Sequence, residues 1–282
     1  MLVTLNEVLK MAEAEKYAVG AFNTPNLECL LAVLHNAEKM QVPVIISHAQ
    51  LHEDIAPLSD IGPVMIAMAK EAKVPVCVHL DHGETLDYLQ KALDMGFTSI
   101  MYDGSLLSYE ENVANTKKTV EMAAKVGASV EAEIGILGGR ESGAKQSEQK
   151  AEDMYTDPEL AKRFVEDTGI DALACSFGTA HGIYKVKPKL DFERIEKIRS
   201  LTKIPLVMHG GSGVSPEDYK EAISKGVRKI NYYSYMSNAG VKAAKELLEN
   251  ENVTFFHEIA IKAEEAMEKD VHKAMKVFYN HE

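Results

Sequence analysis

Eight short segments of β-forming residues recur along this chain of 282 residues, and longer segments with helical spacing of apolar residues separate them. Several of the short segments are continuous apolar runs, as expected of parallel strands that are covered on both faces. Alternating strands and helices predict an α/β fold, and eight strands predict a (β/α)8 TIM barrel. The expected strands cover residues 18–23, 43–49, 75–81, 99–103, 129–134, 172–177, 205–210 and 229–233.

The alternative fold is a doubly wound open sheet, which usually has fewer strands and often a glycine-rich turn after the first strand. Here that turn, residues 23–26 (NTPN), contains no glycine, so the barrel is favoured. No low-complexity linker divides the sequence, and we predict a single domain over residues 1–282. Its tail, at about residues 239–282, has a helical pattern, and the apolar stripe of this helical extension is typical of core or of a subunit interface.

The charge balance limits the partners of this protein. Its 43 acidic and 31 basic residues give a net charge of −12, which opposes binding to phosphate backbones and anionic lipids. We therefore expect a small-molecule ligand, and neither nucleic acid nor a membrane. The first residues do not resemble a signal peptide, no apolar run is long enough to cross a membrane, and three cysteines cannot all pair. These features together predict a cytoplasmic protein.

Three histidines stand at or just after the ends of three different predicted strands, each with glycine nearby. They are His82 in HLDHG, His181 in GTAHG and His209 in HGGSG. The carboxyl ends of barrel strands meet at one face, which carries the chemistry of this fold. Three neutral imidazoles that converge from separate strands, with a fourth position open, are the ligand set of a catalytic zinc ion. The sequence therefore predicts a zinc site at this face.

Carboxylates and a glycine-rich turn lie at the same strand ends. Asp81, Asp103, Glu131 and Glu133 can orient the histidines from outside or act as general acid and base. The turn at residues 209–213 (HGGSG) offers backbone amides and a hydroxyl to a phosphate group, which requires no net positive charge. Together these features predict an anionic small substrate beside a metal ion.

These motifs resemble the class II, metal-dependent fructose-/tagatose-bisphosphate aldolase family. The matching stretches are AVGAFN, HLDHG, MYDGS, VEAEIGILGG, GTAHGIY, HGGSGV and KIN, in this order between residues 18 and 231. The resemblance implies reversible cleavage of a ketose 1,6-bisphosphate, of the fructose or tagatose type, into dihydroxyacetone phosphate and an aldehyde such as glyceraldehyde 3-phosphate. It also implies a homodimer or homotetramer, one Zn²⁺ that stabilises the enediolate, and room for a monovalent cation such as Na⁺ or K⁺.

The same resemblance assigns roles to residues of this chain. Asp81 is expected to be the acid/base at the C4 hydroxyl, and Glu141 to move the proton on the ketone-derived carbon from a lid at residues 138–153. The expected metal ligands and their close neighbours are His82, His181, His209, Glu133 and Asp103. The expected substrate-binding residues, most of them around the phosphate of dihydroxyacetone phosphate, are Asn23, Gly182, Gly210, Gly211, Ser212, Asn231, Tyr233 and Ser234.

Departures from the family pattern all fall on the aldehyde side. Tyr233 replaces a small or acidic residue that touches the sugar, Ala49 stands where a hydroxyl often meets the distal phosphate, and Ser142 replaces a lid aspartate. The aldehyde half can therefore differ, for example in a sulfonated or deoxy ketose 1-phosphate that is modified at C6.

Two other classes of protein stay open. One is a metal-dependent hydrolase of the same fold, which commonly begins with a His-x-His pair that strand one lacks, and the other is a non-catalytic metabolite-binding homologue.

Overall fold

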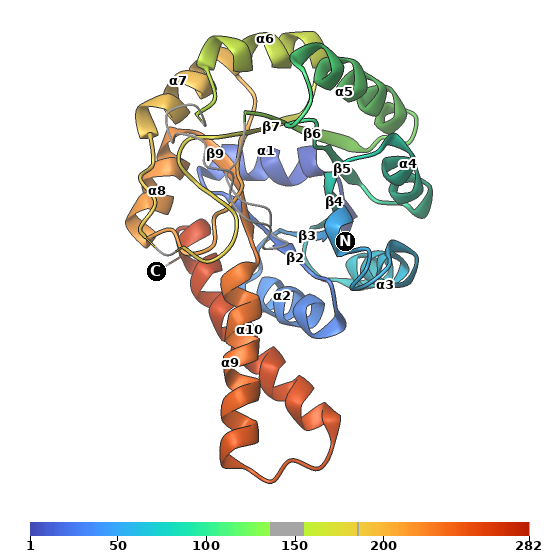
Figure 1. Cartoon of the computed structure of the whole chain (residues 1–282), viewed down its shortest axis with the longest axis vertical. Coiled ribbons are helices and arrows are strands. Elements are labelled where there is room, and N and C mark those ends of the chain that lie inside the picture. The colour runs from blue at the N-terminus through green and yellow to red at the C-terminus, as the bar shows by residue number, and fades with distance from the viewer. Residues whose placement is uncertain (136–154, 185, 282) are drawn as a thin grey trace.

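Eight parallel strands close into a barrel in this computed structural model, which describes residues 1–135, 155–184 and 186–281 (Figure 1). Each strand pairs with the next one along the chain, and the last pairs with the first, where Ala21 lies opposite Asn231. The predicted TIM barrel is therefore confirmed. Its strands are β2 (Val19–Asn23), β3 (Val44–Ala49), β4 (Val76–Gly83), β5 (Ser99–Tyr102), β6 (Ser129–Ile134), β7 (Ala172–Cys175), β8 (Leu206–Met208) and β9 (Val227–Tyr232).

Helices surround the barrel, and most begin at the capping residues that the sequence offers. The side chains of Asn26, Asp157 and Ser215 each accept a hydrogen bond from a backbone N–H in the first turn of the following helix. The helices after successive strands are α2 (Leu27–Met40), α3 (Leu58–Glu71), α4 (Leu86–Met95), α5 (Tyr109–Ala124), α6 (Pro158–Thr168), α7 (Phe192–Thr202), α8 (Pro216–Lys225) and α9 (Ser234–Asn250). A short 3-10 helix, η1 (Gln50–His52), follows β3.

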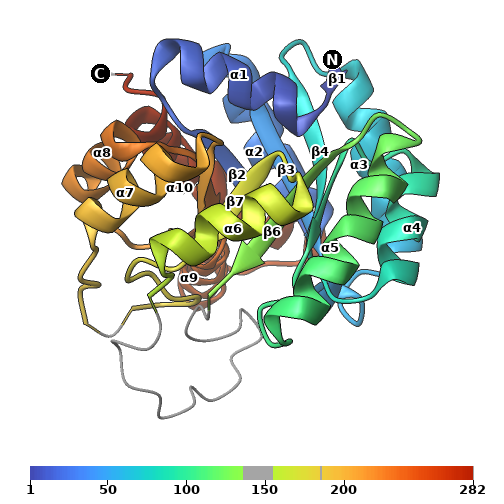
Figure 2. The same cartoon turned by 90° about the horizontal axis from the view of Figure 1, so that it is seen from above.

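An N-terminal strand and helix that the sequence pattern did not predict cover one end of the barrel. Strand β1 (Leu2–Val3) pairs with the start of β4, and helix α1 (Leu5–Glu15) crosses the barrel beside the starts of the strands (Figure 2). The Asn6 amide donates to Asp171 at 2.6 Å, and Glu13 pairs with Arg228 at 2.7 Å. With this end covered, the carboxyl ends of the strands are the open face of the barrel.

Two strands are shorter than predicted, because their final residues turn into loops. The expected strands 172–177 and 205–210 end at Cys175 and Met208. Gly178 and Gly210 lie just beyond, with positive φ angles of 115° and 61°, a conformation that a strand does not contain. The histidine and glycine residues of the HGGSG motif therefore belong to a loop rather than to the strand.

The C-terminal region forms two helices, as predicted, although the first begins at Ser234 rather than near residue 239. Helix α9 and helix α10 (Phe256–Phe278) pack side by side and project from the barrel as an arm (Figure 1). The end of α10 returns to the barrel, where the Phe278 ring is fully buried against the rings of Tyr219 and Tyr232. No helix among the described residues is long and apolar enough to cross a membrane.

The packing of Phe278 gives a prediction about how the tail contributes to stability. Phe278→Ala is expected to lower the free energy of unfolding by about 3–5 kcal/mol, because it opens a cavity in the core. Leu106→Ala is the control, because Leu106 is 69% exposed on the loop before α5 and its loss should cost under about 0.5 kcal/mol. Urea unfolding measures both values, and the predicted single domain requires one transition. Equal effects of the two substitutions would contradict the role of Phe278.

Candidate active site

The three histidines of the predicted metal site meet at the carboxyl ends of their strands. His82 lies in β4, His181 follows β7, and His209 follows β8. One ring nitrogen from each lies within 4.8 Å of the others. The ring of His82 lies 5.1 Å from that of His181 and 4.7 Å from that of His209, between centroids. The structure therefore brings together three residues that are far apart in the sequence.

A backbone irregularity turns His82 toward this cluster. The register between β4 and β5 shifts between Leu80 and Gly83, and His82 has a φ of 46°, in the left-handed region that non-glycine residues rarely adopt. In a regular strand, neighbouring side chains point to opposite faces. The irregularity lets Asp81 and His82 both contribute to the same site. Such backbone strain is typical of functional positions.

Hydrogen bonds decide which nitrogen of His82 and of His209 faces the centre of the cluster. His82 Nδ1 lies 2.7 Å from Asp103 Oδ2, and His209 Nε2 lies 2.8 Å from Glu131 Oε1. Histidine ligands of metals are usually oriented in this way by a carboxylate on the far side of the ring. The opposite nitrogens, His82 Nε2 and His209 Nδ1, are then 3.1 Å apart and available to a shared ligand.

The donor set fits a zinc ion. Three histidine nitrogens within 4.8 Å of one another form the ligand set of a catalytic zinc ion, which keeps its fourth position for substrate. A second group, formed by His82, Asp103 and Glu133, also comes within ligand distance. Glu133 has a buried carboxylate oxygen without a hydrogen-bond partner among the described residues. Burial and the neighbouring carboxylate of Asp103 raise the pKa of Glu133 well above its ordinary value, and a bound cation would offset both effects.

The carboxylate of Glu131, which binds His209, also forms a buried ion pair. Glu131 Oε2 lies 2.8 Å from Lys229 Nζ, and both side chains are fully buried. Burial raises the pKa of Glu131, but Lys229, the hydrogen bond with His209 and the nearby His79 together outweigh burial and lower this pKa to about 2. Glu131 therefore stays ionised and can accept the Nε2 proton of His209. We did not predict Lys229 as part of the site, although its position two residues before Asn231 places both on one face of β9.

Asp81 is held by two amide groups from neighbouring strand ends. Asn23 Nδ2 donates to Oδ2 at 3.0 Å, and Asn231 Nδ2 donates to Oδ1 at 3.2 Å. Burial would raise the pKa of Asp81, but the nearby histidines and Lys229 outweigh it and hold the pKa well below its ordinary value. The carboxylate is thus ionised and fixed in place beside the histidines. The remaining amide oxygens of Asn23 and Asn231 are buried without a partner among the described residues.

The turn from Gly210 to Ser212 contacts the end of β9 and the start of helix α9. Gly210 has a φ of 61°, and an added Cβ would clash with the backbone oxygen of Ala180, so only glycine fits there. Ser212 Oγ accepts a hydrogen bond from Tyr233 N at 3.0 Å. Tyr233 is the N-cap of α9, and its side chain makes no capping hydrogen bond. The N–H groups at this helix start, at Ser234 and beyond, suit an anion.

Tyr184 is a further residue of the site that sequence reasoning missed. Its hydroxyl accepts a hydrogen bond from Ala180 N and donates one to Gly210 O, both at 2.8 Å. It thereby joins the loop that carries His181 and Gly182 to the loop that carries His209. Burial raises the pKa of Tyr184 to about 12, so the hydroxyl keeps its proton. A tyrosine three residues after a histidine gives no sequence signal of this role.

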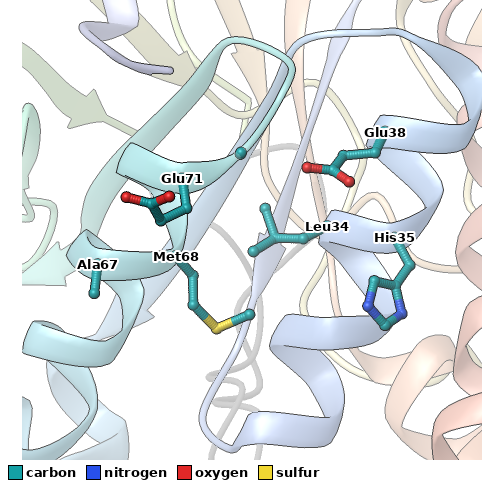
Figure 3. Close-up of a pocket in the computed structure, with 7 residues that line it drawn as sticks. Leu34, His35, Glu38, Ala67, Met68 and Glu71 are labelled. Carbon is teal, nitrogen blue, oxygen red and sulfur yellow. The ribbon is translucent and has the colours of Figure 1, made fainter.

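Glu141 and the whole predicted lid at residues 138–153 lie outside the described residues, so their placement stays a prediction. A separate hollow lies on the outside of the barrel between α2 and α3, lined by Leu34, His35, Glu38 and Met68 among others (Figure 3). It is remote from the strand ends that carry the histidines, and we assign it no catalytic role.

Comparison with known proteins identifies the family of this barrel. The family model for class-II fructose-bisphosphate aldolases matches residues 3–282. This chain belongs to the class II fructose-bisphosphate aldolase family.

Individual relatives cover most of the chain. This chain is 43% identical over 253 residues to a fructose-bisphosphate aldolase of Geobacillus stearothermophilus, and the match covers 88% of this chain and 86% of the relative. It is 38% identical over 265 residues to YdjI of Escherichia coli, a protein described as uncharacterized, covering 94% and 90%. The crystal structure of the YdjI aldolase from Escherichia coli K12 superposes with a TM-score of 0.87 at 34% identity, covering 99% of this chain and 97% of that one.

The buried ion pair gives a prediction about stability. Lys229→Met leaves the Glu131 charge buried and unpaired, and should destabilise the protein by about 3–5 kcal/mol. Adding Glu131→Gln removes that charge and should recover part of the loss. Lys225→Met is the control, because Lys225 forms only an exposed ion pair with Glu196. Chemical unfolding compares the variants, and a single variant as stable as the control would contradict the structural role of Lys229.

Proposed function

We propose that this protein is a zinc-dependent class II aldolase that cleaves a ketose 1,6-bisphosphate, of the fructose or tagatose type, reversibly. The products are dihydroxyacetone phosphate and an aldehyde such as glyceraldehyde 3-phosphate. The observation that carries the proposal is the combination of His82, His181 and His209 with Asp81, an ionised carboxylate fixed next to them. The fructose-bisphosphate aldolases among the relatives support it.

The three histidines would hold the zinc ion, with Asp103 and Glu131 fixing the orientation of two of the rings. When bound, zinc supplies Lewis-acid stabilisation of the negative charge that develops as the carbon–carbon bond breaks. Glu133 and Asp103 lie beside the same position and add negative charge that favours a dication. This donor set makes a lysine Schiff base unnecessary for the reaction.

Asp81 would act on the proton of the C4 hydroxyl. Its depressed pKa keeps it ionised, and its two amide partners leave it one orientation. It accepts the hydroxyl proton as the aldehyde forms, and returns that proton in the condensation direction. We expect Glu141 to exchange the proton on the ketone-derived carbon, as the resemblance to the family implies.

The phosphate of dihydroxyacetone phosphate would bind at the start of α9. The groups that support this placement are the N–H groups of the helix terminus and the bare backbone of the Gly210-Gly211 turn. The residues we propose to contact the substrate are Asn23, Gly182, Gly210, Gly211, Ser212, Asn231, Tyr233 and Ser234. A monovalent cation such as Na⁺ or K⁺ would share Gly182, Gly210 and Ser212 with the phosphate.

The alternatives differ in measurable ways. A panel of fructose 1,6-bisphosphate, tagatose 1,6-bisphosphate and fructose 1-phosphate analogues modified at C6 tests cleavage by the zinc-loaded protein. EDTA-sensitive release of dihydroxyacetone phosphate from a bisphosphate supports the primary proposal. Release from a C6-modified analogue alone would show that the substrate is such an analogue and not a bisphosphate. Absence of release from every compound, with zinc bound, would favour a hydrolase or a non-catalytic binding protein.

Two substitutions separate metal binding from proton transfer. His209→Ala is expected to lose both bound zinc and activity, because it removes one of three ligands. Asp81→Asn is expected to keep zinc but lose about 10²–10⁴-fold in kcat, because an amide cannot accept the hydroxyl proton. Elemental analysis and cleavage kinetics measure the two effects. Full activity of His209→Ala without metal would refute the zinc assignment.

We propose that the arm formed by α9 and α10 joins two copies of the chain into a homodimer, or a homotetramer built from such pairs. Several large apolar side chains on the arm are exposed, including Phe256 at 79%, Phe255 at 61% and Leu248 at 56%. Exposed apolar surface is typical of protein interfaces when it is contiguous, and the arm supplies several such side chains.

A charge placed on the arm tests this assembly. Phe256→Asp is expected to shift the protein from at least twice 31.1 kDa toward the monomer, because the new charge would be buried in the interface. Leu106→Asp is the control, since Leu106 is 69% exposed on the loop before α5, away from the arm. Sedimentation velocity measures the masses. A wild-type monomer would rule out the assembly.

A further inference from the structure

His52 lies just after the carboxyl end of β3, and the proposed mechanism gives it no role. It is the last residue of η1, which follows β3, and its ring packs against that of Tyr233, which follows β9. The two ring centroids are 5.3 Å apart. Strand β2 lies between β3 and β9 and ends at Asn23. The pair therefore flanks Asn23, which holds Asp81.

One ring nitrogen of His52, Nδ1, makes no hydrogen bond to the described part of the protein. The side chain is buried, with 3% of the residue exposed. The histidines of the metal cluster differ, because His82 and His209 each have a carboxylate partner. Leaving a buried ring nitrogen unpaired costs free energy, which a ligand hydroxyl would recover.

The electrostatics of His52 favour a neutral ligand group. Burial lowers the pKa of His52, and the charges of Asp81 and His82 are close enough to act on it in opposite directions. The ring is thus neutral near pH 7 and offers a hydrogen bond without a charge. A neutral imidazole suits a hydroxyl better than a phosphate, for which a cation or several N–H groups are usual.

We propose that His52 is a specificity-determining residue, whose Nδ1 hydrogen-bonds the hydroxyl next to the aldehyde carbon in the acceptor half of the substrate. Tyr233 packs against the ring and holds its orientation. The position of His52 near Asp81 places this hydroxyl beside the one that Asp81 deprotonates. The inference rests on the proposed aldolase activity and adds which group of the aldehyde the protein recognises.

Matched aldehydes that differ only in this hydroxyl test the inference. Condensation with dihydroxyacetone phosphate is measured for lactaldehyde against propanal, and for glyceraldehyde 3-phosphate against 3-oxopropyl phosphate. The wild type should prefer the hydroxylated member about tenfold or more in kcat/KM, because a site built to bind a hydroxyl rejects the analogue without it. His52→Phe should reduce that preference about tenfold, and His52→Gln should keep most of it. His281→Phe is the control, because His281 is an exposed histidine that follows α10.

The outcomes separate this inference from the proposed function. Zinc content and melting temperature of each variant show that it is folded. Equal loss of activity toward both members of a pair in His52→Phe would show a structural role and overturn the inference, while the aldolase assignment would stand. An unchanged preference of His52→Phe for the hydroxylated aldehyde would also overturn the inference and leave the aldolase assignment standing. A wild type that joins none of the aldehydes to dihydroxyacetone phosphate would overturn both.

Discussion

The hydrogen bond between His209 and Glu131 connects the chemistry of this protein to the interior of its barrel. Glu131 is fully buried, and it stays ionised because Lys229 lies 2.8 Å away. Its other oxygen lies 2.8 Å from His209 Nε2, which turns Nδ1 toward His82. The orientation of His209 at the open face thus depends on Lys229, which is fully buried. Each partner satisfies a group that would otherwise be costly to bury.

The same region carries more buried carboxyl groups than buried lysines. Asp81, Glu131 and Glu133 are each at most 2% exposed, and Lys229 is the one lysine among the fully buried large side chains of the described residues. Two amides stabilise Asp81 and the lysine stabilises Glu131, but Glu133 has a raised pKa. A divalent cation held by the histidines would complete this balance. The electrostatics and the ligand geometry therefore favour the same ion.

The barrel and the meeting of the three histidines could be predicted from sequence because both depend on local patterns. Short apolar runs mark the strands, and glycine-flanked histidines mark their ends. Strand β1 escaped prediction because two residues show no periodicity. The turn of His82 depends on the β4–β5 register, and the Glu131–Lys229 pair joins strands that are not neighbours in the sheet. Such contacts form only when the barrel closes, so no local pattern shows them.

Proton exchange of dihydroxyacetone phosphate in deuterated water tests the central claim most directly. This exchange requires the metal, the phosphate turn and a base, but no aldehyde. The zinc-loaded protein should introduce deuterium at the hydroxymethyl carbon. EDTA should abolish the exchange and added zinc should restore it. Folded, zinc-loaded protein that leaves the compound unlabelled would contradict the assignment of this site to aldol chemistry.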